Sequence, residues 1–483
     1  MKWFRLRKIS GEAWPHWCSR VLRIFFRIGL VSVLGGSLVF IFFDPVVTTE
    51  SPPSLKGKFV DELVADGFMG PTDLAITGDG TIFVAERHGV VRIIKNGENL
   101  SQPFVTLTDV NTSGESGLLG LAVHPKFPDI PYVYLLYSVQ YPSHKLPQSA
   151  LVSTFGRLVR FTAEGNVAAK HSEKILIGNG LEDGIPNCSS FHGVGAVQVA
   201  SDGSIYVSAG EGASWEGVDI GDQGDGCDLL FGFDQDTGAR RAQQHNSLAG
   251  KVLRIDSESG LGLPDNPYYD GDLNSPTSRI FGIGFRNPFR FTLRESPGES
   301  SLLYVADVGW TDWEEITIVR AGTNAGWPCF EGPVKVKAYN KHSVVNQLCQ
   351  GVRHEEHLVF PLLSWNRSKP REGWFSGYPR GSFTGHTVTG LEFYTGDQFP
   401  QRYRGALFFA DYGEEWIKVL WVDDQQRLER VEDFAGVDSP VGLEGVEMPV
   451  DLEMNPTNGD LLYVSISAGQ VRRIRFVSQE VLP

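Results

Sequence analysis

Hydrophobic and polar residues alternate along the chain from residue 57 onward, in a unit that recurs six times. Each copy begins with Gly or Pro, runs through alternating apolar residues, crosses a polar turn and enters a second alternating run. Period-two alternation predicts strands, and Asp-Gly and Asn-Gly pairs supply the positive φ that tight hairpins need. We therefore predict a β-hairpin in every copy. The copies begin at Gly70, Gly117, Gly193, Gly284, Gly390 and Pro449.

Six hairpins without intervening helices predict either a large sandwich or barrel, or a propeller in which each copy is the middle of one blade. The copies start about 45 to 105 residues apart, against roughly 40 to 45 in compact propeller repeats. The excess predicts long loops, the longest at 212–248 and 327–384, and loops on a rigid scaffold commonly carry function. If the ring closes, segment 471–476 is expected to pair with segment 58–63.

Composition supports an all-β fold and narrows the class of partner. The 483 residues include 55 Gly, 27 Pro and 11% aromatic side chains, which suit a protein rich in strands and turns. The first 50 residues hold seven basic and three acidic side chains, so the remainder has 36 basic and 55 acidic ones, a net charge of −19. This acidic balance argues against a nucleic-acid partner.

The amino-terminal segment has the pattern of a membrane or signal helix. Seven basic residues precede an uncharged apolar run at 28–43, and positive charge on that side predicts a cytoplasmic amino terminus. The run is either an uncleaved anchor or the core of a cleaved signal peptide, and the lack of a clean cleavage site favours the anchor. Either way, the bulk of the chain is expected outside the cytoplasm. The expected divisions are a basic segment at 1–27, the anchor or signal at 28–43, a linker at 44–56, the folded domain at 57–477 and a tail at 478–483.

The cysteines agree with export. One lies in the amino-terminal segment, and the other four form an even set in an oxidising compartment. We expect the pairs Cys188–Cys227 and Cys329–Cys349, because they close the shorter loops. None of the four has C-x-x-C spacing, which argues against a metal site built from these thiols.

Six motifs follow one another along the domain and together resemble a known family. They are GLLGLAVHPKF (117–127), FHGVGAVQVASDGSIYVSAGEG (191–212), LAGKVLRID (248–256), GFRNPFRF (284–291), VADVGWTDWEEI (305–316) and NAGWPCFEG (324–332). They resemble the propeller domain of soluble quinoprotein glucose dehydrogenases, aldose sugar dehydrogenases and sorbosone dehydrogenases, which Hedgehog-interacting-like proteins share. The resemblance covers about residues 57 to 477 and implies a propeller of six four-stranded blades.

The family oxidises a sugar hydroxyl with pyrroloquinoline quinone and Ca²⁺, so the resemblance also implies a site. His192 matches the base that takes the hydroxyl proton while hydride passes to the quinone, and Glu211 matches the carboxylate that orients this base. Neutral imidazole accepts a proton near pH 7, and a carboxylate fixes its tautomer. Arg286 and Asn287 match residues near the quinone. Glu314 matches a nearby acidic residue.

Three further positions follow from the same resemblance. Gly309 and Trp310 match the residues whose backbone carbonyls bind Ca²⁺, a cation that takes six to eight oxygen ligands. Glu115 matches a polar contact to the sugar.

The chain departs from the family where the sugar enzymes carry cations that neutralise the three quinone carboxylates. Glu414 and Glu415 stand there instead, and burying a trianion beside two carboxylates is unfavourable unless other cations compensate. The candidates for that compensation are Lys335, Lys337, Arg402, Arg404 and Lys418.

Three functions are compatible with these residues. The first is an exported sugar dehydrogenase, dependent on pyrroloquinoline quinone and Ca²⁺, which passes electrons to an external acceptor. The second is a non-catalytic cell-surface propeller that binds a protein or a glycan, as the Hedgehog-interacting relatives do. The third is a Ca²⁺-dependent lactonase or esterase without quinone. The joint presence of His192, Glu211, Arg286 and Asn287 favours the first.

Overall fold

The computed structural model describes the chain from residue 57 to residue 478 and, separately, residues 33–34 and 37–38. The gaps within the longer stretch are 142–153, 223–226, 296–300, 355–356, 369–373 and 376–377. The chain divides into two units, Met1–Val47 and Thr48–Pro483. In the first unit, β1 (Val33–Leu34) pairs antiparallel with β2 (Ser37–Leu38).

The membrane segment predicted at 28–43 lies outside the described residues, apart from those two short strands. The predicted helix across this segment is therefore not confirmed, and both the anchor and the cleaved signal remain predictions. Among the described parts of the chain, no helix is long and apolar enough to cross a membrane.

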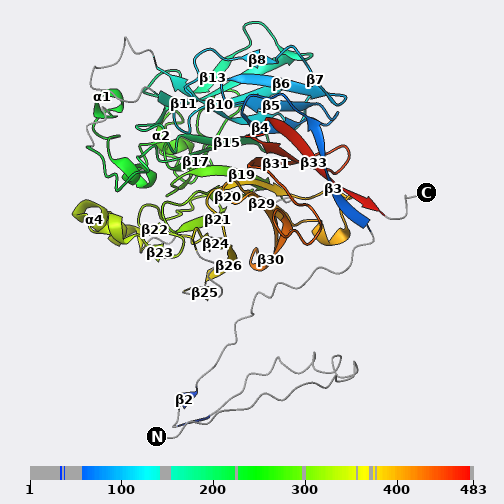
Figure 1. Cartoon of the computed structure of the whole chain (residues 1–483). Coiled ribbons are helices and arrows are strands. Elements are labelled where there is room, and N and C mark those ends of the chain that lie inside the picture. Colours follow the sequence, from blue (N-terminus) through cyan, green and yellow to red (C-terminus); the bar gives the residue numbers. More distant parts are fainter. Residues whose placement is uncertain are drawn as a thin grey trace. The chain divides into compact units, whose positions relative to one another are not determined.

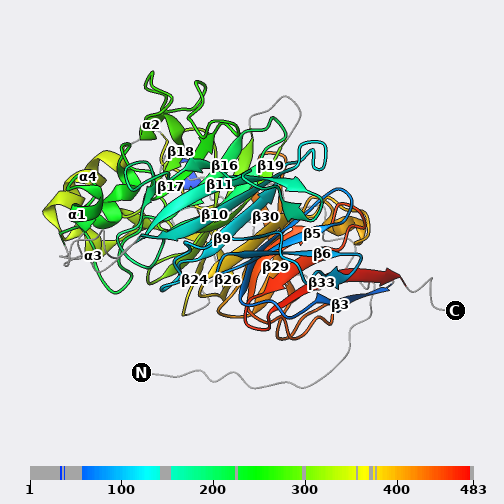
Figure 2. The ribbon, with the colours of Figure 1, turned by 90° about the horizontal axis from the view of Figure 1, so that it is seen from above.

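Within the described residues of the second unit, all strands except a two-stranded sheet at 330–335 form six sheets around one axis, which is a six-bladed β-propeller (Figure 1, Figure 2). The strands of each blade are given from the innermost outward, except that the short strands at the end of the lists for blades 1 and 2 all pair with the third strand of their blade. Blade 1 contains β4 (Pro71–Ile76), β5 (Ile82–Glu86), β6 (Val90–Lys95), β7 (Glu98–Asn99) and β8 (Val105–Thr106). Blade 2 contains β9 (Leu118–Val123), β10 (Tyr132–Gln140), β11 (Thr154–Glu164), β12 (Val167–Ala168), β13 (Lys174–Ile177) and β14 (Ile185–Pro186). Blade 3 contains β15 (Val194–Val199), β16 (Ile205–Ala209), β17 (Lys251–Ile255) and β18 (Ile280–Ile283).

The other three blades continue the ring. Blade 4 contains β19 (Pro288–Arg294), β20 (Leu302–Asp307), β21 (Trp313–Val319), β24 (Leu363–Asn366), β26 (Tyr378–Thr384) and β25 (Trp374–Phe375). Blade 5 contains β27 (Val388–Phe393), β28 (Leu407–Asp411), β29 (Trp416–Val422) and β30 (Leu428–Ala435). Blade 6 contains β31 (Pro449–Met454), β32 (Leu461–Ser465), β33 (Gln470–Ser478) and β3 (Gly57–Ala65).

Each pair of neighbouring blades encloses its own hydrophobic cluster, so the propeller has a core between blades rather than at its axis. A central strand of a blade is consequently buried on both faces, which is why β28 reads as the apolar run at 407–410. The innermost strands contact one another in the order β4, β9, β15, β19, β27 and β31, and β31 returns to β4. They surround the central channel.

The predicted ring closure is confirmed. Strand β3 pairs antiparallel with β33, in a register that places Lys58 opposite Val477 and Leu63 opposite Arg472. Figure 1 shows the blue β3 beside the red β33. An ion pair of 2.8 Å between Arg473 and Glu62 adds to the pairing. The last blade is therefore made from both ends of the domain, which removes a free sheet edge.

One detail of the repeat prediction was wrong. The six hairpin copies do not form the middle of each blade but its two innermost strands, as β4–β5 and β15–β16 do. The reason is that the inner strands pack around the channel and have regular alternation. The outer strands include two-residue pieces such as β7 and β12, which leave little periodic signal.

The two predicted long loops pack together beside blades 3 and 4. Both predicted disulfides, Cys188–Cys227 and Cys329–Cys349, are formed and secure these loops. The two loops share an apolar cluster, which includes Ala213 and Ala239 of the first loop and Trp327 and Tyr339 of the second. Figure 2 shows α1, α3 and α4 on one side of the propeller. The short elements of these and neighbouring loops are α1 (Cys227–Phe231), η2 (Gly238–Gln243), α2 (Pro276–Arg279), β22 (Phe330–Glu331), β23 (Val334–Lys335), α3 (Lys337–Asn340), α4 (Ser343–Val352) and η3 (Gln401–Tyr403).

Candidate active site

A pocket of about 520 Å³ lies at the end of the channel where the innermost strands begin. Residues at or just before the start of all six inner strands line it, which makes it the point where the blades converge. These residues are Thr72, Leu119, His192, Asn287, Thr389 and Val450. Its aromatic lining consists of Phe191, Trp215, Phe289, Trp310 and Tyr412. The pocket therefore combines broad apolar faces with polar groups, as small-molecule sites commonly do.

The structure brings His192 and Glu211 together at this pocket. Nδ1 of His192 lies 3.1 Å from Oε1 of Glu211, and the two side chains are only 3% and 1% exposed. The other carboxylate oxygen accepts a hydrogen bond from Nε1 of Trp327. Burial, assisted by the charge of Arg286, lowers the pKa of His192 to about 3, so the imidazole is neutral near pH 7. Burial raises the pKa of Glu211 to about 8.

The protonation state of Glu211 decides which nitrogen of His192 can act as a base. An ionised Glu211 accepts the Nδ1 proton of the imidazole and leaves Nε2 with its lone pair. A protonated Glu211 can instead donate to Nδ1, which places the ring proton on Nε2. No described residue hydrogen-bonds Nε2. The tautomer of His192, and so the nitrogen that could accept a proton, thus depends on one neighbouring carboxylate.

The backbone of His192 is held in a strained conformation, with φ at 51°. Its N–H donates to Oε2 of Glu115 at 3.2 Å, and its carbonyl accepts from the N–H of Gly212 at 2.8 Å. Gly210 allows this geometry, because a Cβ there would lie 2.4 Å from the His192 carbonyl oxygen. Glu115, predicted as a substrate contact, therefore lies on the pocket wall beside His192.

Arg286 and Asn287 are positioned by one buried carboxylate. Their backbone N–H groups donate to Oδ2 and Oδ1 of Asp307 at 3.0 and 2.6 Å. Nη1 of Arg286 donates to the carbonyls of Val308 and Gly309 at 2.9 and 2.6 Å, while its buried Nε has no hydrogen-bond partner. Burial raises the pKa of Asp307 to about 7. The Arg286 side chain is thus fixed at the pocket and retains an unused donor.

The loop that carries Gly309 and Trp310 is secured by Glu331, which belongs to the last predicted motif. Oε1 of Glu331 accepts hydrogen bonds from four consecutive backbone N–H groups, and the carboxylate is buried. The donors are Trp310 at 2.7 Å, Thr311 at 2.9 Å, Asp312 at 3.0 Å and Trp313 at 3.2 Å. The acidic residue of the motif therefore orders the neighbouring loop.

Arg367 is a pocket residue that no motif indicated. It follows β24 directly, in the second predicted long loop, and its Nη1 donates to the carbonyls of Trp310 at 2.7 Å and Gly309 at 3.3 Å. Its Nε lies 3.0 Å from Oε1 of Glu314, which is fully buried. Burial raises the pKa of Glu314 to about 8, while Arg367 acts in the opposite direction. Glu314 is therefore placed below the pocket wall, as the partner of an arginine.

The arrangement does not fit Ca²⁺ at the predicted place. The carbonyl oxygens of Gly309 and Trp310 both accept hydrogen bonds from guanidinium groups, those of Arg286 and Arg367. A divalent cation there would meet two positive charges and lack the six to eight oxygen ligands it takes. Across the described segments, no group of three or more His, Cys, Asp or Glu residues could hold a metal ion.

The charges around the pocket also differ from the prediction. Glu414 and Glu415 are not part of its lining, and Glu414 lies 3.5 Å from the exposed His386. Nor do the five predicted compensating cations line it; Arg402 and Lys418 pair with Glu432 and Asp433. Positive charge comes instead from three arginines, Arg87, Arg286 and Arg367.

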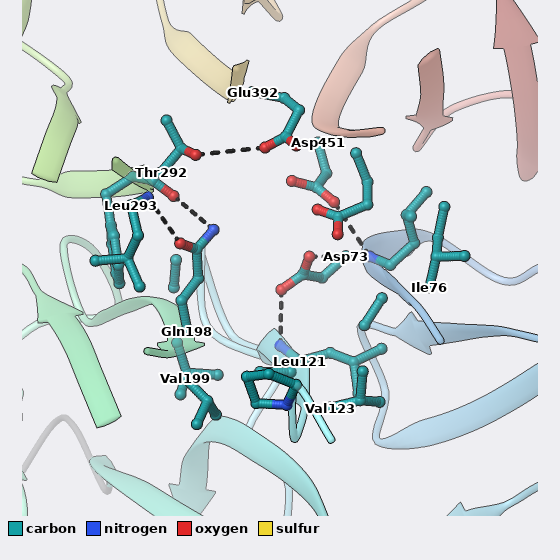
Figure 3. A pocket seen from close by; sticks show the side chains of 18 of the residues that line it. Asp73, Ile76, Leu121, Val123, Gln198, Val199, Thr292, Leu293, Glu392 and Asp451 are labelled. Atoms are coloured by element: carbon teal, nitrogen blue, oxygen red, sulfur yellow. Dashed lines mark hydrogen bonds between the residues drawn. The ribbon is translucent and has the colours of Figure 1, made fainter. Parts of the chain in front are cut away.

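A second pocket, of about 400 Å³, lies at the opposite end of the same channel. Figure 3 shows Asp73, Glu392 and Asp451 facing this cavity. Oδ2 of Asp73 accepts a hydrogen bond from the N–H of Leu121 at 2.7 Å, and the buried Arg290 lies 3.4 Å from Asp451. Burial, together with the charge of Asp73, raises the pKa of Asp451 well above its usual range. This end of the channel is acidic.

Comparison with known proteins gives concordant similarities. The model of the glucose/sorbosone dehydrogenase family matches residues 68–441. The chain is 27% identical over 361 residues to the HIPL2 protein of Arabidopsis thaliana, a match that covers 66% of this chain but only 46% of the plant protein. It is 26% identical over 321 residues to quinoprotein glucose dehydrogenase B of Acinetobacter calcoaceticus, covering 63% and 60% of the two chains.

Among solved structures, the fold is similar to aldose sugar dehydrogenase of Streptomyces coelicolor in its form bound to pyrroloquinoline quinone. The TM-score is 0.58 at 17% sequence identity, over 87% of this chain and 99% of that one. At this identity the likeness concerns the fold alone.

Proposed function

Because the chain belongs to the glucose/sorbosone dehydrogenase family, we propose that it is a sugar dehydrogenase dependent on pyrroloquinoline quinone, which oxidises a hydroxyl group of an aldose or a related polyol. Its main support is the buried His192–Glu211 pair, which opens on a pocket lined by three arginines. The quinoprotein relative in Acinetobacter agrees with this proposal.

The pocket suits a planar anionic cofactor. Pyrroloquinoline quinone is a flat aromatic molecule with three carboxylates, and guanidinium groups bind carboxylates through paired, planar hydrogen bonds. Arg286 has a buried Nε without a partner, and Arg87 and Arg367 line the same pocket. Trp215 and Trp310 offer aromatic faces. When bound, the quinone would supply the hydride acceptor for the oxidation.

The residues of the chain would perform the proton transfer. His192 would accept the hydroxyl proton at Nε2 while Glu211 holds the Nδ1 proton, and Trp327 keeps that carboxylate in place. Burial of the pair keeps the imidazole neutral and limits competition from water. A positioned general base of this kind contributes about 10² to 10⁴ in rate. Glu115 would contact the sugar, and Asn287 would lie beside the quinone.

The direct test is calorimetric titration of the purified chain with pyrroloquinoline quinone, followed by dye reduction with a panel of aldoses and polyols. We expect saturable binding and sugar-dependent reduction of the dye as the external electron acceptor. Quinone binding without reduction of dye by any sugar would contradict the enzymatic proposal. Absence of quinone binding would contradict the proposal altogether.

We propose an extracytoplasmic location, supported by the two disulfides, which are typical of oxidising compartments. Attachment to a membrane would depend on the segment at 28–43. A second candidate function is a non-catalytic propeller that binds a protein or a glycan, and the similarity to HIPL2 favours it. It would replace the first if the titration gives no heat while a glycan array or a pull-down gives a specific partner. For the third candidate, the Ca²⁺-dependent lactonase, the pocket carbonyls offer no support, because guanidinium groups bind them.

A further inference from the structure

On the premise that the proposed function is correct, we infer that the guanidinium of Arg367 is a built-in cation that takes the place of a metal at the Gly309 and Trp310 carbonyls. The chain would then bind its anionic cofactor without a divalent cation.

The first support is the geometry of Arg367 itself. Nη1 donates to both carbonyls, at 2.7 Å to Trp310 and 3.3 Å to Gly309. Nη2 donates to the carbonyl of His386, and Nε lies 3.0 Å from Glu314. All three nitrogens are therefore held by the protein. The side chain is still 23% exposed and lines the pocket, so its positive charge faces a ligand there.

The second support is the charge balance around Glu314. Its side chain is fully buried, and Oε2 accepts a hydrogen bond from the N–H of Val388 at 3.0 Å. A buried carboxylate is strongly unfavourable without a counter-charge, and Arg367 supplies one from within the chain. A metal at the carbonyls would have to displace the guanidinium and leave it without these partners.

The third support is that the carbonyls are held in place from both sides. Glu331 binds the N–H groups of the loop, and Arg286 donates to the Gly309 carbonyl at 2.6 Å. The loop is therefore not free to turn its carbonyls toward another position. The guanidinium groups of Arg286 and Arg367 both bind this pair of carbonyls. They supply, without a metal, the positive charge that an anionic ligand needs at this wall of the pocket.

The first experiment measures metal binding to the quinone-free protein. Tb³⁺ has oxygen ligands like those of Ca²⁺, and the indole of Trp310 would sensitise its luminescence at this site. We expect no Ca²⁺-displaceable Tb³⁺ luminescence with the wild type. We expect it to appear in Arg367→Gln, which leaves Oε1 of Glu314 and the Trp310 carbonyl to the metal, while Arg286 still binds the Gly309 carbonyl. Displaceable luminescence in the wild type that is unchanged in Arg367→Gln would overturn the inference.

The second experiment measures quinone affinity by calorimetry in EDTA and in Ca²⁺ buffer. For the wild type we expect the two dissociation constants to agree within twofold. Arg367→Gln should bind the quinone at least tenfold more weakly in EDTA, and Ca²⁺ should restore part of this affinity. The affinity of Arg367→Lys in EDTA should lie between those of the wild type and Arg367→Gln. The control is Arg427→Gln, which removes an arginine that pairs with Asp423 at the surface and should behave like the wild type. Wild-type binding that Ca²⁺ tightens more than tenfold would overturn the inference.

These outcomes separate the inference from the proposed function. If the wild type binds no quinone in either buffer, the proposed function fails, while the luminescence experiment still decides whether the carbonyl pair accepts a metal. If Arg367→Gln does not fold, Arg367→Lys retains the charge without the planar fork. If Arg367→Lys binds the quinone in EDTA as tightly as the wild type does, the positive charge at this position is what replaces the metal. If Arg367→Lys binds the quinone only with Ca²⁺, although it keeps the charge, the inference is contradicted.

Discussion

The two ends of the propeller channel are built from the same six strands but are lined by opposite kinds of side chain. Where the inner strands begin, the pocket is lined by Arg87, Arg286 and Arg367. Where they end, the lining contains Asp73, Glu392, Asp451 and Glu453. The protein therefore presents a basic end and an acidic end to ligands that approach along the axis. The three arginines of the first end attract an anionic ligand there, so the fold alone does not decide where a ligand binds.

A single arginine connects the two linings. Nη2 of Arg290 donates to the carbonyl of Thr72 at 2.5 Å, and Thr72 lines the basic pocket. The same guanidinium lies beside Asp451 in the acidic pocket. The basic and acidic linings are thus separated by the length of one side chain. Arg290 does not make the second pocket basic, because its guanidinium is paired with the neighbouring carboxyl groups.

The largest expected effect comes from comparing the substitution of one histidine at each end of the channel. His192→Ala should lower the rate of sugar-dependent dye reduction by about 10² to 10⁴, because it removes the proposed general base. The matched control, His124→Ala, removes a buried histidine that lines the acidic pocket and should leave the rate within threefold. Steady-state kinetics with saturating quinone would measure both. Equal losses in the two variants would mean that the rate does not depend on a base at the basic end.

The next effect compares two buried arginines. Arg286→Ala should weaken quinone binding roughly 10- to 100-fold, because a hydrogen bond to a charged group contributes about 1.5 to 3 kcal/mol. Arg290→Ala should leave quinone affinity nearly unchanged but lower the free energy of unfolding by about 3 kcal/mol, since it removes the ion-pair partner of the buried Asp451. Calorimetric titration and thermal unfolding would separate the two outcomes. Weaker quinone binding in Arg290→Ala, with the fold intact, would contradict the assignment of the ligand to the basic end.

A third effect is the pH dependence of the reaction rate, which tests the role of Glu211 at the basic end. Burial raises the pKa of Glu211 to about 8, so the carboxylate that holds the Nδ1 proton of His192 forms as pH rises through that value. The rate should therefore increase about tenfold from pH 7 to its plateau. Arg286, Arg241 and Asp219 also act on this carboxylate. In Glu211→Gln this limb of the pH profile should disappear, whereas a retained limb would assign it to another group.

The smallest effect concerns the stability of the acidic end. Burial raises the pKa of Glu392 from 4.5 to about 8, so the folded state holds a proton that the unfolded state releases. Its stabilising contribution is complete below pH 4.5 and is lost as pH rises toward 8. Glu392→Gln should therefore gain stability relative to the wild type between those values, by at least about 1 kcal/mol at pH 8. Melting temperatures across this range would measure the gain, with the surface variant Glu429→Gln as control. A difference that does not grow with pH would place the ionisation elsewhere.

Much of the fold was accessible from the sequence because its signals are local. The six inner hairpins follow from alternation and turn residues, and both disulfides follow from spacing. The closure of β3 on β33 follows from the need to remove a sheet edge. The outer strands were less predictable, because many are short and depend on tertiary pairing.

The site was predicted unevenly for a physical reason. His192, Glu211 and Arg286 lie in motifs, and the structure brings them together at one pocket. Arg367 reaches that pocket from 58 residues beyond Gly309, in a segment without periodicity or motif. Only the folded chain shows this contact. Glu414, in contrast, stands at a suggestive position but is absent from the pocket lining, since a residue's place along a strand does not fix what its side chain meets.

The four backbone hydrogen bonds that Glu331 accepts have an electrostatic consequence for the pocket, although Glu331 is not part of the pocket lining. The N–H of Trp310 and the carbonyl of Gly309 belong to one peptide group, as do the N–H of Thr311 and the carbonyl of Trp310. A carboxylate binds one pole of each peptide dipole, and arginines bind the other pole. The Glu331 carboxylate therefore polarises both peptide groups. As a result, their carbonyl oxygens accept stronger hydrogen bonds from Arg286 and Arg367 at the pocket wall.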